Sequence, residues 1–219
     1  MRARQVFVVV LAHAVFLFPA MAGVINLTSV AASEIGDANF DGLGDSLYSA
    51  PGLSVALGPV REERTGFEFD LSGWPLSAAD VHRAFVNFYR GAQAGSCNGN
   101  VPCLEPTSIQ VYGYSGNGVM GVGDYSAGSL LGAFAPPPRV NSYFRLDVTD
   151  FVKNLIGNGD PFAGFTVRPG SNGGIFLYDP HGGDIAVALL RIEPVPEPAS
   201  VLLLGSGLAA AMLVRRRKA

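Results

Sequence analysis

Glycine, proline, asparagine and aspartate interrupt the apolar segments between residues 23 and 193 so often that no long helical stripe fits there. The 219-residue chain contains 28 glycines and 15 prolines. The apolar runs between them are short or alternate with polar residues, as in residues 67–71, where two phenylalanines and a leucine fall on one face of a strand. Short strands between turn residues are typical of a β-sandwich. The sequence therefore predicts an all-β fold.

Nine segments are candidate strands. They are residues 53–57, 66–71, 83–90, 108–114, 129–134, 142–148, 162–168, 174–178 and 184–192. Residues 77–80 have the pattern of a capping box, and the apolar residues that follow, in 81–88, fit a helix about as well as a strand. Aromatic and β-branched residues cluster in 84–89, which favours the strand.

One short helix is expected at residues 149–157, between two strands. Thr149 can cap it, Asp150 suits its first turn, and Gly157 can end it.

The first 22 residues have the pattern of a secretory signal peptide. Two arginines precede the apolar run 6–18, and Ala20 and Ala22 are small residues at the positions that signal peptidase reads, which predicts cleavage before Gly23. The alternative is an N-terminal membrane anchor, but the apolar run is short. We expect the Sec translocon to export the chain and signal peptidase to cleave it.

The C-terminus has a second signal-like pattern. Val195-Pro196-Glu197-Pro198 stands before an apolar segment, 199–214, and a basic tail, 215–219. The tail's arginines are Arg215, Arg216 and Arg217. As a helix, residues 201–214 would cover only about 21 Å of a hydrocarbon core that is roughly 30 Å thick, and the basic tail would stay on the cytoplasmic side. This pattern predicts a transmembrane helix that serves as a temporary anchor.

These C-terminal residues resemble the PEP-CTERM sorting signal of Gram-negative bacteria that produce exopolysaccharide. The resemblance covers residues 195–219. It implies that exosortase, an integral-membrane cysteine transpeptidase, cleaves near the Pro-Glu-Pro triplet after transient anchoring in the inner membrane. The implied destination is the cell surface or the extracellular exopolysaccharide matrix.

The two terminal segments suggest a division of the chain. We expect a signal peptide at 1–22, a turn-rich segment at 23–52, a β-sandwich at 53–193 and the sorting signal at 194–219. An exported body of about 175 residues is long enough for one sizeable core.

The exported body is acidic. Between residues 23 and 196 nine of the 15 lysines and arginines remain, against seventeen of the 18 acidic residues, a net charge of −8. This charge argues against nucleic acid and anionic lipid as partners and is compatible with calcium or neutral glycans.

Five segments of the body follow one another in a recognisable order. They are Arg64 to Leu71, Ala84 to Phe88, Ile109 to Tyr114, Phe144 to Val152 and Gly164 to Val167. The succession resembles the DNRLRE-type jelly-roll domains of bacterial surface proteins, which implies a jelly-roll β-sandwich across about residues 53–192. The chain departs from that family at 119–125, where it has a glycine-rich loop in place of a tryptophan-bearing strand.

The two cysteines, Cys97 and Cys103, are expected to form a disulfide. The five residues between them include glycine and proline, which let the sulfurs meet in an oxidising compartment. Metal binding is the alternative, but two thiols without a nearby histidine make a poor zinc site.

Residues 37–45 match the front half of an EF-hand-type calcium loop. Oxygen ligands at positions 1, 3, 5 and 9 are Asp37, Asn39, Asp41 and Asp45. Gly42 stands at position 6, but Tyr48 replaces the bidentate carboxylate at position 12, so the expected dissociation constant is about 10⁻⁴ M or weaker. The alternative is an ion-free turn. No pattern requires any other cofactor.

Catalytic patterns are scarce in the sequence. It contains no Gly-x-Ser-x-Gly elbow, Walker loop or His-Glu-x-x-His helix. Asp179 and His181 could act as acid and base, but they lie in a segment typical of a hairpin tip. The body's single lysine, Lys153, and its acidity argue against a lyase for uronic-acid polymers. We predict a non-catalytic protein; the alternative is a secreted hydrolase or lyase acting on polysaccharide.

Two aromatic residues in loop-like contexts, Trp74 and Tyr125, are candidate glycan contacts. Flat amphipathic rings can stack on the apolar faces of sugars, although aromatic residues more often belong to the core. The prediction from sequence is therefore an exported, exosortase-processed, non-catalytic protein of the cell surface or extracellular matrix. A glycan-binding module and a purely structural matrix protein both stay open.

Overall fold

Antiparallel strands make up most of the described chain in this computed structural model, which describes residues 23–49, 52–93, 104–136, 138–178 and 188–195. The strands are β1 (Ile25–Thr28), β2 (Ala31–Asp37), β3 (Ser46–Tyr48), β4 (Gly52–Leu57), β5 (Glu62–Asp70), β6 (Val81–Gln93), β7 (Ile109–Ser115), β8 (Ser129–Phe134), β9 (Ser142–Asp147), β10 (Phe162–Pro169), β11 (Gly173–Tyr178) and β12 (Leu189–Pro194). The helical elements are α2 (Thr149–Asn158) and the 3₁₀ turns η1 (Ala78–Asp80) and η2 (Val122–Tyr125). Each predicted strand overlaps an observed one, so the all-β fold with one short helix is confirmed.

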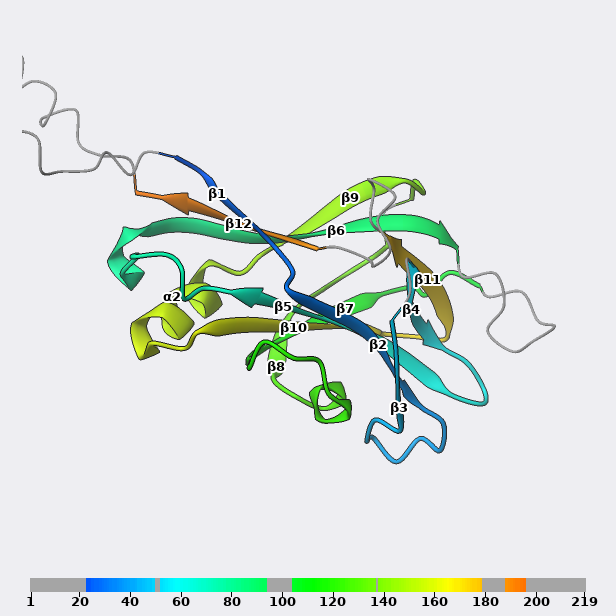
Figure 1. Cartoon of the computed structure of the whole chain (residues 1–219). Helices are drawn as coiled ribbons and strands as arrows, with labels where there is room; N and C mark the ends of the chain where they lie inside the picture. Colours follow the sequence, from blue (N-terminus) through cyan, green and yellow to red (C-terminus); the bar gives the residue numbers. More distant parts are fainter. Residues whose placement is uncertain (1–22, 50–51, 94–103, 137, 179–187, 196–219) are drawn as a thin grey trace, which may run out of the picture. The chain divides into compact units, whose positions relative to one another are not determined.

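The strands form one hydrogen-bonded sheet that folds over into two layers. Its order is β1-β12-β6-β11-β4-β5-β10-β7-β8, with β2 joined to β5 and β3, and β9 joined to β6. Figure 1 shows β1, β12, β6 and β9 in one layer and β2, β5, β10 and β7 in the other. Phe67 of β5 and Phe88 of β6 meet between the layers, with ring centroids 5.6 Å apart. The predicted β-sandwich is therefore confirmed, whereas the jelly-roll strand order stays a prediction.

Alternating apolar side chains fill the space between the layers. On β6, Ala84, Val86 and Phe88 are buried in the same core as Phe67, Phe69 and Phe165 from the opposite layer. The capping box at residues 77–80 is present in η1, and the chain continues from it as strand β6. The strand interpretation of 83–90 was thus the correct one.

Helix α2 packs Val152 and Leu155 into this core, but its ends differ from the prediction. Val148 is the N-cap, and the Thr149 hydroxyl instead donates to Asp147 Oδ1 (2.6 Å) and accepts from the Ala84 N–H (2.9 Å). Gly159 ends the helix in place of Gly157, because its φ of +78° lets its N–H turn back to the Ile156 carbonyl at 3.1 Å.

The segment 23–52 was predicted to be turn-rich and outside the sandwich, and the structure corrects this. It contains β1, which pairs with β12, β2, which pairs with seven residues of β5, and β3 beside β2. Strand β2 consists largely of small and polar residues with weak strand propensity, so its pairing with β5 determines its conformation.

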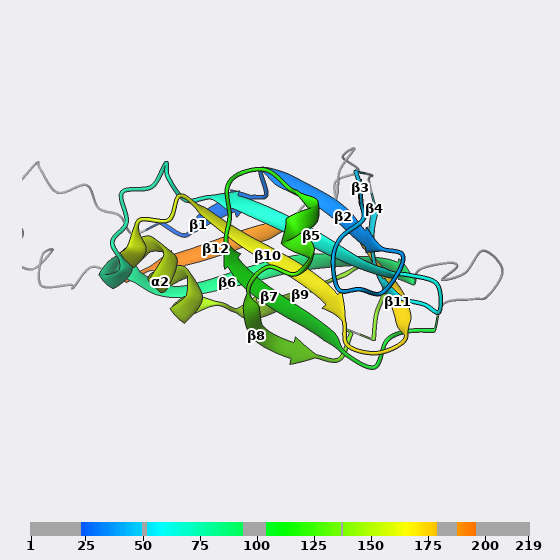
Figure 2. The same ribbon diagram turned by 90° about the horizontal axis from the view of Figure 1, so that it is seen from below.

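The glycine-rich loop 116–128 lies against the outer side of β5 and β10 (Figure 2). The buried Glu68 carboxylate accepts the N–H groups of Asn117, at 3.0 Å, and Gly118. Thr166 Oγ1 donates to the Asp124 carbonyl at 3.2 Å, and Arg168 donates to the Ala127 carbonyl at 3.0 Å. These bonds hold on the sheet a loop that has few apolar side chains of its own.

Several predictions fall on residues outside the described ranges. These are the signal peptide with its cleavage site, the Cys97–Cys103 disulfide, the Asp179–His181 segment and the sorting segment from Pro196 onward. Within the described ranges no helix has the length and apolar character needed to cross a membrane.

Two glycines with similar backbone conformations should respond differently to substitution. Gly128 and Gly159 have φ of +86° and +78°, but only at Gly128 would a Cβ crowd the backbone, 2.3 Å from the Gly113 carbonyl oxygen. We expect Gly159→Ala to lower the free energy of unfolding by about 1 kcal/mol and Gly128→Ala by about 3 kcal/mol, measured by urea denaturation of the secreted protein. Equal losses would contradict the crowding at Gly128.

Candidate functional site

Trp74 is presented by a tight turn that follows β5. The Asp70 carboxylate accepts hydrogen bonds from the Ser72 N–H (2.8 Å) and hydroxyl (2.6 Å), which closes the turn. The Leu76 N–H then bonds back to the Trp74 carbonyl at 2.8 Å. The indole remains 41% exposed although it is a large apolar group. This turn therefore holds the only tryptophan of the chain at the surface.

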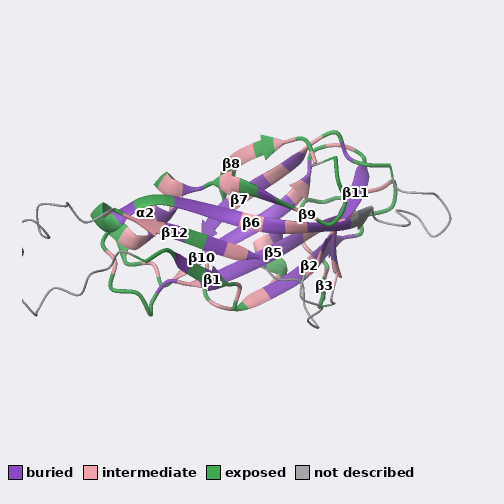
Figure 3. Cartoon of the chain, turned by 90° about the horizontal axis from the view of Figure 1, so that it is seen from above, coloured by how far each residue is buried: buried purple, intermediate pink, exposed green. Residues whose placement is uncertain are grey.

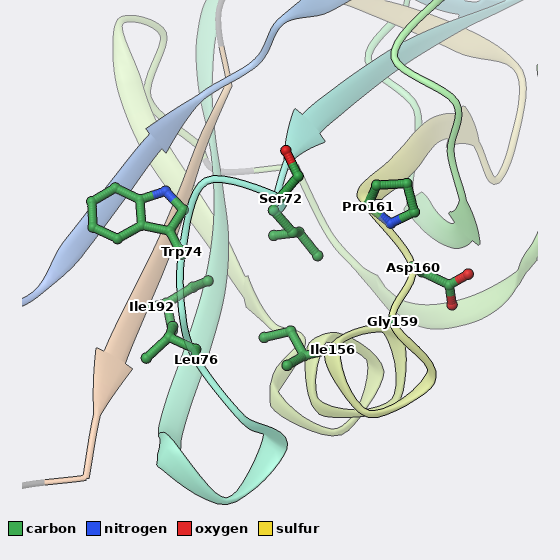
Figure 4. A pocket seen from close by; sticks show the side chains of 9 residues that line it. Ser72, Trp74, Leu76, Ile156, Gly159, Asp160, Pro161 and Ile192 are labelled. Atoms are coloured by element: carbon green, nitrogen blue, oxygen red, sulfur yellow. The ribbon is translucent and has the colours of Figure 1, made fainter.

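A pocket of about 210 Å³ lies beside Trp74. Figure 4 shows Trp74 and Ile192 on one side of it and Asp160 and Pro161 on the other. The remaining lining residues are Leu71, Ser72, Leu76, Ile156 and Gly159. The pocket thus combines an apolar lining with a hydroxyl and a carboxylate, and Asp160 is oriented by a 2.9 Å hydrogen bond from the Ser115 hydroxyl.

A second hollow also uses Trp74. It is lined by Asn26, Leu27, Thr28, Val30, Asp70, Gly73 and Trp74. Hydrogen bonds from the Ser72 hydroxyl and N–H hold the pKa of Asp70 below its usual value, so this side chain stays a carboxylate in mildly acidic solution. The two hollows share the Trp74 ring, and each contains a carboxylate that accepts hydrogen bonds. This arrangement suits a sugar with free hydroxyl groups.

Sequence reasoning found Trp74 but missed its polar neighbours. Asp70 and Ser72 follow a strand in the Asp-x-Ser pattern of a side-chain-closed turn, so this part was detectable. Asp160 and Ile192 come from segments far along the chain, and only the fold brings them to the pocket.

Tyr125 is not a glycan contact in this structure, contrary to the sequence prediction. Its side chain is fully buried and packs with Ile35 and Met120. The Arg64 guanidinium carbon lies 3.6 Å from the centre of its ring, and Arg64 also donates to the Tyr125 carbonyl at 2.6 Å. The glycine-rich loop turns the tyrosine inward, so its ring has no face left for a sugar.

The four predicted calcium ligands lie in one loop between β2 and β3. Their oxygens accept backbone N–H groups along the loop: Asp37 from Gly42, Asn39 from Asp41, Asp41 from Leu43 and Asp45 from Ala38, at 2.8 to 2.9 Å. Phe40 and Gly42 have positive φ. Among the described residues no three His, Cys, Asp or Glu side chains are grouped so that they could hold a metal ion. Calcium binding here stays a prediction.

Two glutamates near the β4–β5 turn form a carboxylate pair that sequence reasoning missed. Burial, and secondarily the charge of Glu63, raises the pKa of Glu34 to about 7, although the Ser54 N–H donates to it at 2.8 Å. Glu63 is itself buried and forms an ion pair with Arg61. A carboxyl group with such a pKa can serve as a general acid, and this is the observation that favours the alternative of an enzyme.

Residues 194–218 match the family model described as the PEP-CTERM protein-sorting motif. The chain carries a PEP-CTERM sorting signal. This confirms the resemblance predicted for residues 195–219 and implies an exported protein that exosortase processes, with a membrane-anchored sorting segment before cleavage. No curated protein matches the sequence.

Solved structures show only distant similarity to the chain. A xylan-binding module, CBM15, is 12% identical over 78% of this chain and 97% of its own, with a TM-score of 0.37. A latent aurone synthase (polyphenol oxidase) is 14% identical over 61% of this chain and 24% of its own, with a TM-score of 0.33. The K1 adhesin domain of Lys-gingipain from Porphyromonas gingivalis W83 is 12% identical over 77% of this chain and 97% of its own, with a TM-score of 0.31. These scores are too low for a ligand or an activity to be transferred.

The raised pKa of Glu34 predicts a pH-dependent stability. Because this folded-state pKa of about 7 exceeds the ordinary value of 4.5, the stability that neutral Glu34 contributes below pH 4.5 is lost as the pH rises to about 7. We expect Glu34→Gln to abolish this loss. At about pH 8 the free energy of unfolding of the variant should exceed that of wild type by about 1–2 kcal/mol, a figure smaller than the full pKa shift implies because Glu34 is partly exposed to solvent.

Urea denaturation across this pH range provides the measurement. The control Glu193→Gln removes a partly exposed carboxylate on β12, far from Glu34 in the strand order, and should keep the wild-type pH profile. An unchanged profile in Glu34→Gln would show that Glu34 ionises normally.

Proposed function

We propose that the mature protein is a non-catalytic component of the cell surface or extracellular polysaccharide matrix and that it binds a neutral glycan at Trp74. The observation that carries the proposal is the exposed indole ring shared by two hollows with polar walls. The sorting signal supports the export of the domain. A polysaccharide-rich destination is part of this proposal.

The chemistry around Trp74 favours neutral sugars. An indole face packs against the C–H groups of a sugar ring, and carboxylates accept hydrogen bonds from hydroxyl groups. Asp70 and Asp160, one in each hollow, are such acceptors and would repel a negatively charged sugar. The net charge of −8 on the body acts in the same direction. The ligand class is therefore a polysaccharide rich in hydroxyl groups and without acidic groups.

The sorting step follows from the C-terminal sequence. Pro196 and Pro198 restrict their own φ angles and disfavour helix in the residues before them, which predicts from sequence an extended triplet ahead of the apolar segment. An extended segment beside the membrane is accessible to a membrane-embedded transpeptidase. Exosortase is thus the partner during maturation, and the polysaccharide is the partner afterwards.

Replacing Pro196, Glu197 and Pro198 together by alanine should block maturation. We expect the variant to remain in the membrane fraction with its C-terminal peptide attached, because the alanines let the apolar helix extend through the recognition segment. Cell fractionation and intact-mass measurement would show this. Pro138→Ala, an exposed proline outside the sorting signal, is the matched control and should mature normally; normal maturation of the triple variant would refute the proposed processing.

Trp74→Ala should weaken binding to neutral polysaccharide by about tenfold or more, since the loss of one aromatic stacking surface removes roughly 1–2 kcal/mol. Affinity electrophoresis and a glycan array on the processed protein would measure the loss. Trp74→Phe should recover part of the binding, and both variants should keep the wild-type thermal midpoint because the ring is exposed.

The wild-type protein supplies the remaining outcomes of the same measurement. Binding to no neutral glycan would exclude the glycan-binding part and leave a structural matrix role. Binding that disappears in chelator and weakens in Asp41→Asn would support calcium in the 37–45 loop. Cleavage of the bound polymer, measured as new reducing ends and abolished by Glu34→Gln, would overturn the non-catalytic assignment.

A further inference from the structure

The outer side of strands β6 and β9 carries a second group of aromatic and basic side chains. Pairing sets Phe85 opposite Asp147, Asn87 opposite Arg145 and Tyr89 opposite Tyr143. The intervening residues of β6, Ala84, Val86 and Phe88, belong to the core. Because side chains alternate along a strand, these three pairs share the face that points away from the core. We call it the β6–β9 face; Figure 3 views the layer from this side and shows no helix over the middle of β6 and β9.

A pair of tyrosines occupies one end of the β6–β9 face. The rings of Tyr89 and Tyr143 are 5.0 Å apart between centroids and meet edge to face at 66°. Tyr143 is nevertheless 51% exposed, whereas Tyr89 is half-buried. The edge-to-face contact fixes the orientation of the Tyr143 ring before any ligand arrives, so stacking on it costs little side-chain entropy.

Three arginines lie on and beside the same face. Arg145 is exposed, and its guanidinium carbon lies 4.9 Å from the centre of the Phe85 ring. Arg83 precedes Phe85 by two residues on β6, and Arg191 lies on β12, next to β6. Among the described residues these three arginines stand against three carboxylates, Asp147, Asp150 and Glu193, so the region is balanced in charge within an exported body whose net charge is −8.

Two of these carboxylates, Asp147 and Glu193, already have partners. Asp147 accepts hydrogen bonds from the Thr149 hydroxyl (2.6 Å) and N–H (3.0 Å), and these bonds, led by that of the hydroxyl, lower its pKa. Glu193 accepts from Arg191 at 3.0 Å. In the described part of the chain Arg145 forms no ion pair, so its guanidinium is available to a negatively charged ligand.

We infer that the β6–β9 face binds an anionic polysaccharide of the uronic-acid class, with Arg145 pairing with a carboxylate and Tyr143 stacking on a sugar ring. Guanidinium groups match carboxylates through two parallel hydrogen bonds. Opposite Arg145, the Asn87 Nδ2 group already donates to the Phe85 and Leu189 carbonyls, so only the Asn87 amide oxygen is offered to a sugar hydroxyl. The exposed Tyr143 ring offers a flat apolar surface on which a sugar ring can stack. A small carboxylate ion has no ring to stack there, so the site favours a polysaccharide. This charge complementarity distinguishes the β6–β9 face from the hollows at Trp74.

Nucleic acid fits the β6–β9 face less well. Tight binding to its phosphate backbone commonly uses about 6–10 cationic contacts, whereas the described residues of this region supply three arginines within an acidic body. A uronic-acid chain carries its charges farther apart and offers sugar rings between them. The observations therefore favour the polysaccharide, and nucleic acid becomes an outcome of the test.

The decisive experiment compares polygalacturonate with the same polymer after chemical reduction of its carboxyl groups. We expect the processed protein to bind polygalacturonate at least about tenfold more tightly than the reduced, neutral polymer, as measured by affinity electrophoresis and titration calorimetry. Added salt should weaken the binding, because the Arg145 contact is ionic. Equal binding to both polymers, or tighter binding to single-stranded DNA, would overturn the inference.

Variants separate this face from a general charge effect. Arg145→Gln and Tyr143→Ala should each weaken polygalacturonate binding by about tenfold, whereas Lys153→Gln, which removes one positive charge from α2, should not. Tyr143→Phe keeps the stacking ring and should retain most of the binding. Unchanged binding in Arg145→Gln, or equal losses in Arg145→Gln and Lys153→Gln, would refute the proposed site. The inference does not rest on the Trp74 site. In Trp74→Ala, binding to neutral glycan should weaken while binding to polygalacturonate stays unchanged.

Discussion

Contact between phenylalanines from opposite layers is the interaction on which the sandwich depends. Phe67 and Phe88 meet across the layers, Phe88 continues to Phe144, and Phe144 to Phe134, each with ring centroids 5.3 to 5.6 Å apart. The chain of rings links four strands that do not all share hydrogen bonds. With the apolar side chains committed to this core, the outer sides of the strands and the turns are free to carry polar and aromatic groups.

The two proposed ligand surfaces arise from different parts of this architecture. Trp74 reaches the surface because a turn closed by Asp70 leaves the sheet, whereas Tyr143 does so because its strand alternates between the core and solvent. Their surroundings differ as well: carboxylates lie beside Trp74, whereas Arg145 follows Tyr143 by two residues on the same face of β9. If both surfaces bind as proposed, one small domain connects a neutral polysaccharide chain to an acidic one.

The sequence predicted those features that depend on neighbouring residues. Alternation located the strand of Phe67 and Phe69, and the flanking glycine and proline marked the turn of Trp74. It failed where distant residues decide the outcome. Strand β2 takes its conformation from β5, and Tyr125 is drawn inward by Arg64, 61 residues earlier in the chain. The carboxylate pair of Glu34 and Glu63 was invisible for the same reason, since each acid looks like an ordinary strand residue by itself.

The position of Ile192 has a mechanical consequence. This residue lies in the wall of the Trp74 pocket and is also two residues from the end of β12, the strand that leads into the sorting segment. When a bound polymer is pulled while the C-terminus is held at the cell surface, the load passes from the pocket directly into β12. Neighbouring β1 and β6 share it through their hydrogen bonds, and Phe88 on β6 connects this path to the phenylalanine core. Ligand binding at Trp74 is in this way mechanically coupled to the strand that precedes the sorting segment.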